Sequence, residues 1–459
     1  MATLAIVGAG FCGTMVATHV LRGPASRIER VVVVERNGRE VGGVAYGTPS
    51  TSHTLNVPAG RMSAFDDDPD DFLGYVRDRD PALTGGSFVP RRVYGEYLVR
   101  TLSAAARASE VDLIRVSGEA VDVEEHAGGV RLTLLDGRIV DAERAVLAVG
   151  NYPPSDPPAA AERLATSLRY ARDPWAPDAL ERARDEPLLL LGSGLTMCDV
   201  VLALRDDDQR APIVAISRRG LLPQAHRLST TPPPHLDPPA ELDDWPDTAL
   251  GLLRGLRREV RAAGERGIDW REVVTSIRAQ TPALWQRLGI EERRRFLRHA
   301  RPYWETHRHR SSPETAFAVE SMRESGALEL LPGRVARLVE TATGVAVTYA
   351  PRDGSSPREL VVGKVINCTG PDTDLARVRD PLIHALRAHG LVRADPLGLG
   401  LDTDEDGRLI RADGSPSERL TLVGPLRKGR LWEHTAVPEL RVEARRVAER
   451  LSAQEQVSD

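Results

Sequence analysis

The 459-residue sequence predicts an α/β fold made of two similar units and an inserted helical segment. Three observations predict this fold. Near the N-terminus an apolar run, a glycine-rich turn, an apolar-periodic stretch and a β-branched run follow one another, and the same order recurs from residue 188. Between residues 246 and 310, strand patterns give way to helical periodicity. Each repeated unit therefore predicts parallel strands joined by a helix.

Composition and charge exclude several classes of protein. Lys and Arg number 61 against 66 Asp and Glu, which gives a formal net charge of -5 with the two signs interleaved. We therefore expect neither a nucleic-acid nor a membrane partner. The sequence begins directly with a strand-and-turn pattern, and no apolar run reaches about 18 residues. We expect a cytoplasmic protein, and nothing here indicates its oligomeric state.

The three cysteines, Cys12, Cys198 and Cys368, are far apart in the sequence. They form neither a C-x-x-C pair nor a cluster with metal-ligand spacing. Flavoprotein disulfide reductases need two neighbouring thiols to pass electrons to a disulfide. The sequence offers no such adjacent pair, which disfavours that class.

The first glycine-rich turn, at residues 8–13 (GAGFCG), follows the apolar strand at 4–7 and opens a helix. Gly8 would permit the tight turn, Gly10 would let the backbone approach a pyrophosphate, and Gly13 would allow close helix-strand packing. Glu35 ends the next strand, at the spacing where a carboxylate accepts hydrogen bonds from a ribose diol. The pattern predicts a dinucleotide site, and the alternative is a glycine turn without a ligand.

Residues 111–150 contain alternating segments, including VDVEE from Val121, and end in RAVLAVG. They predict a small antiparallel element that leads back into a parallel strand. The proline-rich stretch 151–158 then breaks the pattern.

The second glycine-rich turn runs from Gly192 to Cys198, where a small cysteine replaces the third glycine. Cys198 is more readily explained by packing than as a nucleophile. The strand after it ends in Arg218 and Arg219 instead of an acid, which suits a ribose that bears a 2′-phosphate. NADPH is thus favoured over NADH. The alternative is that both arginines form a solvated strand end.

The segment after this unit begins with an irregular linker at 231–244 and continues as a helical insertion to residue 310. His307 and His309, at i and i+2, diverge on a helix, so we expect no metal site. Arginines in the run 305–310 could hold a cofactor phosphate or an anionic substrate, or could be solvated. Trp270, Trp285 and Trp304 are interpreted as core residues. Strand patterns resume at 327–370, and a strand at 419–424 precedes a helix that begins near Thr435.

These motifs resemble the flavoproteins with two dinucleotide-binding domains, and among them a bacterial group described as FAD/NAD(P)-binding proteins. Wider relatives include flavin-dependent monooxygenases, among them amine N-hydroxylases. The resemblance spans nearly the whole chain. It is carried by GAGFCG, residues 42–63, FVPRRVYGEYL at 88–98, AVLAVGN at 145–151, LLLLGSG, VINCTGP at 365–371 and residues 424–441.

The resemblance implies two Rossmann-like domains, with FAD in the first and NADPH in the second. It places the discontinuous FAD domain at 1–155 and 365–459, the NAD(P) domain at 156–230 and 311–364, and the insertion at 231–310. The residues expected to bind FAD are Gly8, Gly10, Phe11, Cys12, Gly13, Glu35, Arg36, Asn56, Met62, Val121, Ala148, Gly150, Gly424, His434 and Thr435. Those expected to bind NADP are Gly192, Ser193, Gly194, Thr196, Arg218 and Arg219.

Several of these residues have specific implied roles. Ala148 to Gly150 look like the exit motif between the domains, and Cys368 to Gly370 look like a second one. Segment 44–62 resembles the loop beside the flavin ring, although its glycines and prolines alone would also specify an ordered turn-rich loop. In related flavoproteins an aspartate follows the glycine that corresponds to Gly424, and it binds the ribityl chain of the flavin. This chain has Pro425 at that position, so the resemblance does not supply this contact. Glu433, His434 and Thr435 are candidates for the flavin pyrimidine edge.

Three functions remain open. The first is an NADPH-dependent flavin monooxygenase, in which a flavin (hydro)peroxide transfers oxygen to a small nucleophilic substrate such as an amine or amino acid. No catalytic residue is identified, because the cofactor would supply the chemistry. The second is a reductase or dehydrogenase without oxygen insertion. The third is a flavin-binding sensor without turnover.

Overall fold

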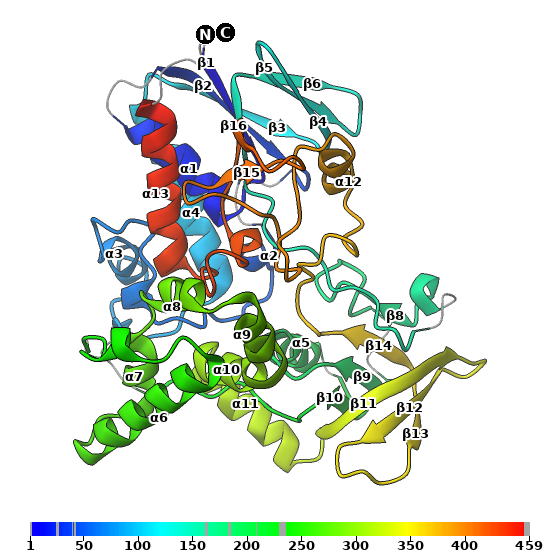
Figure 1. The fold of residues 1–459 in the computed structure, drawn as a ribbon. Coiled ribbons are helices and arrows are strands. Elements are labelled where there is room, and N and C mark those ends of the chain that lie inside the picture. Colours follow the sequence, from blue (N-terminus) through cyan, green and yellow to red (C-terminus); the bar gives the residue numbers. More distant parts are fainter. Residues whose placement is uncertain are drawn as a thin grey trace.

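The computed structural model describes residues 2–23, 27–38, 40, 43–160, 164–181, 185–207, 209–228 and 236–453. Two sheets dominate it, and helices pack against each of them (Figure 1). Gly42 of the motif at 42–63 and residues 231–235 of the expected linker lie outside the described residues.

The first sheet has six strands and is parallel except at one edge. Its order is β15 (Arg408–Ile410), β16 (Pro416–Leu422), β7 (Arg144–Leu147), β1 (Ala2–Val7), β2 (Ile28–Glu35) and β3 (Asp112–Ser117). Strands from both ends of the chain meet here, since β16 pairs with β7 in parallel. The first domain is therefore discontinuous, as the sequence predicts.

Both faces of this sheet are buried, which explains the nearly continuous apolar run of β2. Leu4 and Ile6 of β1 face a core formed with helices α1 (Phe11–Arg22), α4 (Arg91–Ala108) and α13 (Val437–Ala453). Ala5 and Val7 point the other way. There they meet helix α12 (Pro381–Ala388) and the small antiparallel sheet of β4 (Ala120–His126), β5 (Gly129–Leu134) and β6 (Ile139–Ala142). The expectation of a small antiparallel element is confirmed.

The second sheet has seven strands. Its order is β13 (Arg358–Val362), β12 (Val345–Pro351), β11 (Leu328–Glu340), β10 (Ile213–Ser217), β9 (Leu188–Leu191), β14 (Lys364–Asn367) and β8 (Tyr170–Ala171). Helices α5 (Leu195–Asp206) and α11 (Pro313–Glu324) pack together beside it. The boundary expected at residue 365 falls inside β14, so the chain returns to the first sheet only after residue 367.

The helical insertion contains no strand among described residues 246–310. It consists of α6 (Ala249–Glu265), α7 (Trp270–Ser276), α8 (Thr281–Arg287), α9 (Ile290–Arg295) and α10 (Arg301–Arg308). It lies below α13 in Figure 1. The short helices α2 (Gly43–Tyr46) and α3 (Asp71–Arg77) belong to the first domain. No helix in the described part of the chain has both the length and the apolar character that a bilayer crossing requires.

Candidate functional site

The three glycines of the first turn have different surroundings. A Cβ on Gly8, whose φ is 105°, would lie 2.5 Å from the Ala148 carbonyl oxygen. A Cβ on Gly13 would lie 1.9 Å from the Gly8 carbonyl oxygen. Among the described residues, a Cβ on Gly10 would meet nothing within 4 Å. The chain itself therefore requires glycine at positions 8 and 13, whereas position 10 faces open space that a ligand can use.

The N-terminus of α1 is open toward that space. Gly10 is the N-cap residue, and a glycine has no side chain with which to cap the helix. Such an end presents backbone N–H groups and the positive end of the helix dipole to an anion. Beside it, Glu35 accepts hydrogen bonds from the Ala9 N–H at 2.8 Å and from the Asn37 N–H at 3.1 Å. These bonds hold the carboxylate next to the turn, where the sequence predicts a ribose contact.

The second turn has the same construction. A Cβ on Gly192, whose φ is 104°, would lie 2.6 Å from the Cys368 carbonyl oxygen, while one on Gly194 would meet nothing within 4 Å. Gly194 is the N-cap of α5, so here too the N-cap residue has no capping side chain. Ser193 directs its hydroxyl to the Leu221 carbonyl oxygen at 2.6 Å. That bond fastens the turn to the loop after β10.

Cys198 occupies the position of the missing third glycine. It is buried, and burial raises the pKa of its thiol to about 12. Burial also raises the pKa of Cys12 and Cys368. Since the thiolate is the nucleophile, none of the three cysteines is suited to thiol-disulfide exchange. A packing role for Cys198 agrees with this burial.

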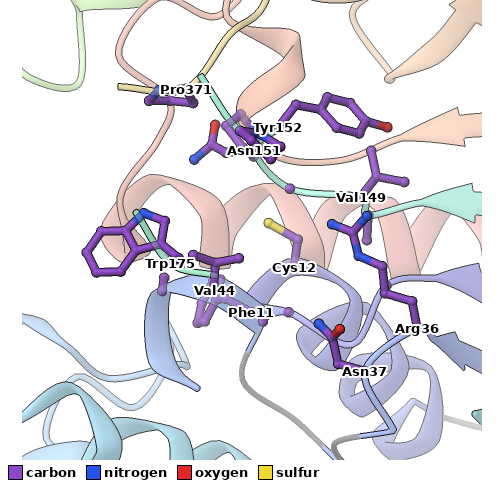
Figure 2. Close-up of a pocket in the computed structure, with 18 of the residues that line it drawn as sticks. Phe11, Cys12, Arg36, Asn37, Val44, Val149, Asn151, Tyr152, Trp175 and Pro371 are labelled. Carbon is purple, nitrogen blue, oxygen red and sulfur yellow. The ribbon is translucent and has the colours of Figure 1, made fainter. Parts of the chain in front are cut away.

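One cavity of about 370 Å³ runs from the first turn to the second domain. Figure 2 shows Arg36 and Asn37 at one end and Trp175 at the other, with Phe11 and Cys12 between them. The predicted residues that line it are Gly8, Gly10, Phe11, Cys12, Glu35, Arg36, Ala148, Gly150, Thr435 and, from the second domain, Thr196. A single space thus connects the starts of α1 and α5.

The other predicted residues lie outside the lining of this cavity. They are Gly13, Asn56, Met62, Val121, Gly424, His434, Gly192, Ser193, Gly194, Arg218 and Arg219. Met62 belongs to the apolar core. In β4 it is Ala120 that lines the cavity, one residue before Val121. Gly424 packs against Cys12, and its neighbour Pro425 lines the cavity.

The structure adds cavity residues that the sequence did not single out, chiefly Arg91, Tyr152 and Trp175. Arg91 stands at the start of α4 and forms a 2.9 Å ion pair with the buried Asp199 of α5. It also donates from Nε to the Thr54 carbonyl oxygen at 3.0 Å. Arg91 lies within the quoted stretch FVPRRVYGEYL, but nothing in that stretch indicates a partner on another domain.

The two arginines after β10 lie at the surface of the second domain. Arg218 is exposed, and the Arg219 guanidinium lies 5.5 Å from the centre of the Tyr303 ring. Hydrogen bonds from Arg352 and Arg219 lower the pKa of the Tyr303 hydroxyl. The end of β10 therefore carries several guanidinium groups, as a phosphate site requires.

His307 and His309 point to different partners. His307 bonds through Nδ1 to the Tyr303 carbonyl oxygen at 2.8 Å, and His309 lies 3.0 Å from Glu433. Among described residues, the group with metal-ligand spacing is Asp122, Glu124 and His389, which lies elsewhere and is largely exposed. Trp285 is buried and stacks on Trp432 at 4.6 Å, as a core residue should.

Comparisons with known proteins agree with this architecture. Residues 5–152 match a family model described as FAD-NAD(P)-binding. None of the curated proteins matches the chain. Among solved structures, the chain is similar to the ornithine N-hydroxylase of Kutzneria sp. 744, in a complex described as containing FADred, NADP+ and L-orn. The identity is 14%, the TM-score is 0.63, and 98% of each chain is covered.

Two further structures extend the comparison. The L-lysine 6-monooxygenase of Pseudomonas syringae is 16% identical with a TM-score of 0.62, over 98% of this chain and 99% of its own. The thioredoxin reductase of Lactococcus lactis is 10% identical with a TM-score of 0.53, over 98% of both chains. The chain therefore has the fold of the flavoproteins with two dinucleotide-binding domains, and the predicted resemblance is confirmed at the level of fold.

Proposed function

We propose that this chain is an FAD-dependent, NADPH-using monooxygenase that acts on a small nucleophilic amine or amino acid. One observation carries the proposal: a single cavity joins the uncapped start of α1 to Thr196 near the start of α5. Ligands held at the two glycine turns would share that cavity. The N-hydroxylating enzymes of ornithine and lysine have the same fold over almost the whole chain. In this proposal the enzyme works in the cytoplasm and its partners are the small substrate and molecular oxygen.

The residues around the first turn fit a flavin dinucleotide. Gly10 and the α1 N–H groups would hold the diphosphate, and Glu35 would accept hydrogen bonds from the ribose. When bound, FAD would take a hydride from NADPH and support the reaction of oxygen with the substrate. The overall reaction converts NADPH, a proton, O₂ and substrate into NADP+, water and oxygenated substrate.

The chain's own contribution is to bind, orient and exclude water. Tyr46, Tyr152 and Trp175 line the cavity together with Phe11, and so do the prolines Pro153, Pro154, Pro174 and Pro371. Burial raises the pKa of Tyr46 and of Tyr152, so both hydroxyls remain protonated at neutral pH. Aromatic and proline side chains at this part of the wall limit the access of water to a reactive intermediate.

Oxygen incorporation is the direct test of this function. The yellow, FAD-loaded protein should be bleached by NADPH without oxygen. With ¹⁸O₂ and a panel of primary amines and amino acids, one substrate should acquire a single labelled oxygen for each NADPH consumed. Mixing the reduced protein with oxygen should also produce a transient absorbance that differs from oxidised and reduced flavin.

Two other outcomes would reject the monooxygenase. Reduction by NADPH without labelled product, for any substrate tested, would indicate a reductase that delivers electrons to an external acceptor. A bound flavin that NADPH does not reduce at a useful rate would indicate a sensor.

Selectivity for NADPH gives a second prediction. Replacing Arg218 and Arg219 together with alanine should raise the KM for NADPH on the order of 10- to 100-fold, because charge-assisted bonds to the 2′-phosphate are lost. The KM for NADH should change little. Arg210→Ala is the matched control, since Arg210 is exposed at the opposite end of β10. An equal loss for both nucleotides would contradict the 2′-phosphate role.

A further inference from the structure

Four tyrosines form a row of ring contacts in the first domain, where α2 and α3 pack against α4 (Figure 1). The ring centres of Tyr46 and Tyr94 lie 4.7 Å apart, and those of Tyr94 and Tyr97 lie 5.4 Å apart. Tyr75 follows, with its ring centre 5.3 Å from that of Tyr97. Aromatic rings at such separations are in direct contact. An electron can therefore pass from ring to ring along this tyrosine row.

One end of the tyrosine row reaches the cavity. Tyr46, the last residue of α2, is half-buried and lines the cavity. It belongs to segment 44–62, which the sequence predicts to pass beside the flavin ring. Tyr94 and Tyr97 are buried behind it, at 0% and 2% exposure, and contact neither the cavity nor the solvent. Tyr46 is thus the member of the row that a ligand in the cavity would touch.

The next interior tyrosine, Tyr97, has a proton acceptor. Its hydroxyl donates to the carboxylate of Asp71 and accepts the Ala64 N–H at 3.1 Å. Burial, and then the hydrogen bond to Asp71, raise the pKa of Tyr97, so the phenol is protonated at rest. A phenol that loses an electron becomes a strong acid, and a carboxylate within hydrogen-bond reach can take its proton. Asp71 is partly exposed at the start of α3 and can pass that proton to solvent.

The two neighbours of Tyr97 are less suited to hold an oxidised state. The Tyr94 hydroxyl is buried and has no hydrogen-bond partner in the described part of the chain, so its proton has no acceptor. The ring of Tyr75 lies 4.0 Å from the Arg79 guanidinium and 5.2 Å from that of Arg100. Two cations oppose a positive charge on this ring. Tyr94 is therefore a relay, and the oxidised state settles on Tyr97.

Packing alone does not account for the hydroxyl of Tyr94. A buried hydroxyl without a partner costs free energy. Phenylalanine fills nearly the same volume, as Phe72 does in the same cluster with its ring centre 4.9 Å from that of Tyr94. A hydroxyl group also makes an aromatic ring easier to oxidise. Tyrosine at this position therefore serves electron transfer better than it serves packing.

We propose that Tyr97 is a redox-active tyrosine with Asp71 as its proton acceptor. It gives one electron to an oxidant in the cavity, by way of Tyr94 and Tyr46. The oxidant is the light-excited ring of bound FAD, which gains that electron. Tyr97 loses the electron and its hydroxyl proton, which Asp71 takes up, and becomes a neutral phenoxyl radical. Return of the electron and the proton restores both groups.

This inference rests on FAD binding in the cavity, which is one part of the proposed function, and it does not depend on oxygen transfer. The tyrosine row gives an excited flavin a reversible way to decay. It thereby spares the cavity wall from oxidation.

A blue light pulse on the anaerobic FAD-loaded protein tests the proposal without NADPH or substrate. Transient absorption and electron paramagnetic resonance should detect one phenoxyl radical for each electron that the flavin gains. Tyr97→Phe should abolish this radical. Asp71→Asn should lower its yield on the order of 100-fold, because an amide is a poor proton acceptor. Tyr46→Phe should interrupt the path, so that the radical yield falls and the flavin fluorescence rises.

Tyr75→Phe is the matched control, since it removes a hydroxyl from the same row beyond Tyr97. It should leave the radical yield unchanged. Tyr97→Phe also removes the bond to the Ala64 N–H, so a second variant is needed that keeps the hydroxyl. Incorporation of 3-fluorotyrosine at position 97 does so, and it should add a fluorine splitting to the resonance signal.

The contrary outcomes are distinct. A radical that persists in Tyr97→Phe, or that lacks the fluorine splitting, lies on another side chain, and the proposal is then wrong. A yellow wild-type protein without any phenoxyl radical would also overturn it. Colourless protein that does not take up FAD would reject the flavin site, and with it both this proposal and the proposed function. Failure of ¹⁸O incorporation together with a fluorine-split radical would reject the monooxygenase alone and support the role of Tyr97.

Discussion

Replacing Gly13 with alanine is expected to destabilise the protein by about 3 kcal/mol and to abolish FAD binding. Alanine in a helix normally gains about 1 kcal/mol over glycine. Here the added Cβ would lie 1.9 Å from the Gly8 carbonyl oxygen and 3.2 Å from the Ala148 Cβ. The obstacle is backbone, so α1 must move away from the turn. The clash therefore outweighs the helix propensity.

Gly10→Ala is the matched comparison in the same turn. Its Cβ would meet no atom of the described residues within 4 Å, and the φ of Gly10 is an ordinary -69°. The FAD-free variant should lose less than about 1 kcal/mol of stability, the usual effect of alanine at an N-cap. Its affinity for FAD should fall on the order of 100-fold, because the methyl group enters the space of the diphosphate.

Urea unfolding of the FAD-free proteins and titration with FAD separate these two effects. Gly13→Ala should shift the unfolding midpoint, whereas Gly10→Ala should shift only the FAD titration. Unchanged FAD affinity in Gly10→Ala would mean that no diphosphate lies at the start of α1. The assignment of the first turn would then be wrong.

Removing Arg91 is expected to have the second large effect. Arg91→Ala should cost about 3–5 kcal/mol, because it leaves the Asp199 carboxylate buried without its counter-ion. Burial already raises the pKa of Asp199, and Arg91 and then His53 oppose that rise. Without Arg91 the carboxyl group should take up a proton more readily.

The same pair joins α4 of the first domain to α5 of the second. Losing it should also slow flavin reduction by NADPH, on the order of 100-fold if the two cofactors shift by about 1 Å. Arg92→Ala is the control, since Arg92 is the next residue of α4 and is exposed. It should change stability by no more than about 0.5 kcal/mol.

Thermal unfolding and anaerobic stopped-flow reduction measure the two consequences. Asp199→Asn should be milder than Arg91→Ala, because it removes the buried charge together with the ion pair. If Arg91→Ala reduces stability but leaves the reduction rate unchanged, the pair does not position the two domains for hydride transfer.

Much of the fold is predictable from the sequence because it depends on neighbouring residues. A strand followed by glycines at fixed spacing has few possible paths, and Gly8 and Gly13 show close contacts that only glycine tolerates. Glu35 is placed beside the turn because it ends the adjacent parallel strand. The discontinuity of the first domain also follows from the order of strand patterns along the chain.

The lining of the cavity is harder to predict, because a shift of one residue along a strand turns a side chain to the opposite face. In β4 the sequence favours Val121, but Ala120 lines the cavity, since successive residues of a strand face opposite sides. Met62 lies in a segment with no regular period, and only packing places it in the core. The sequence also favours Gly424, but Gly424 packs against Cys12 and its neighbour Pro425 lines the cavity. Which of the two lines it depends on how the chain packs against Cys12.

By itself, the sequence determined the two glycine turns, their order and the helical insertion, because these are recorded in local spacing and periodicity. Only the tertiary structure decided which distant charges meet. Arg91 finds Asp199 across 108 positions, and Arg308 finds Glu439 across 131. Such ion pairs depend on how whole helices pack against one another. The same packing excludes water from the charged groups, so each buried charge needs a partner that the fold brings to it.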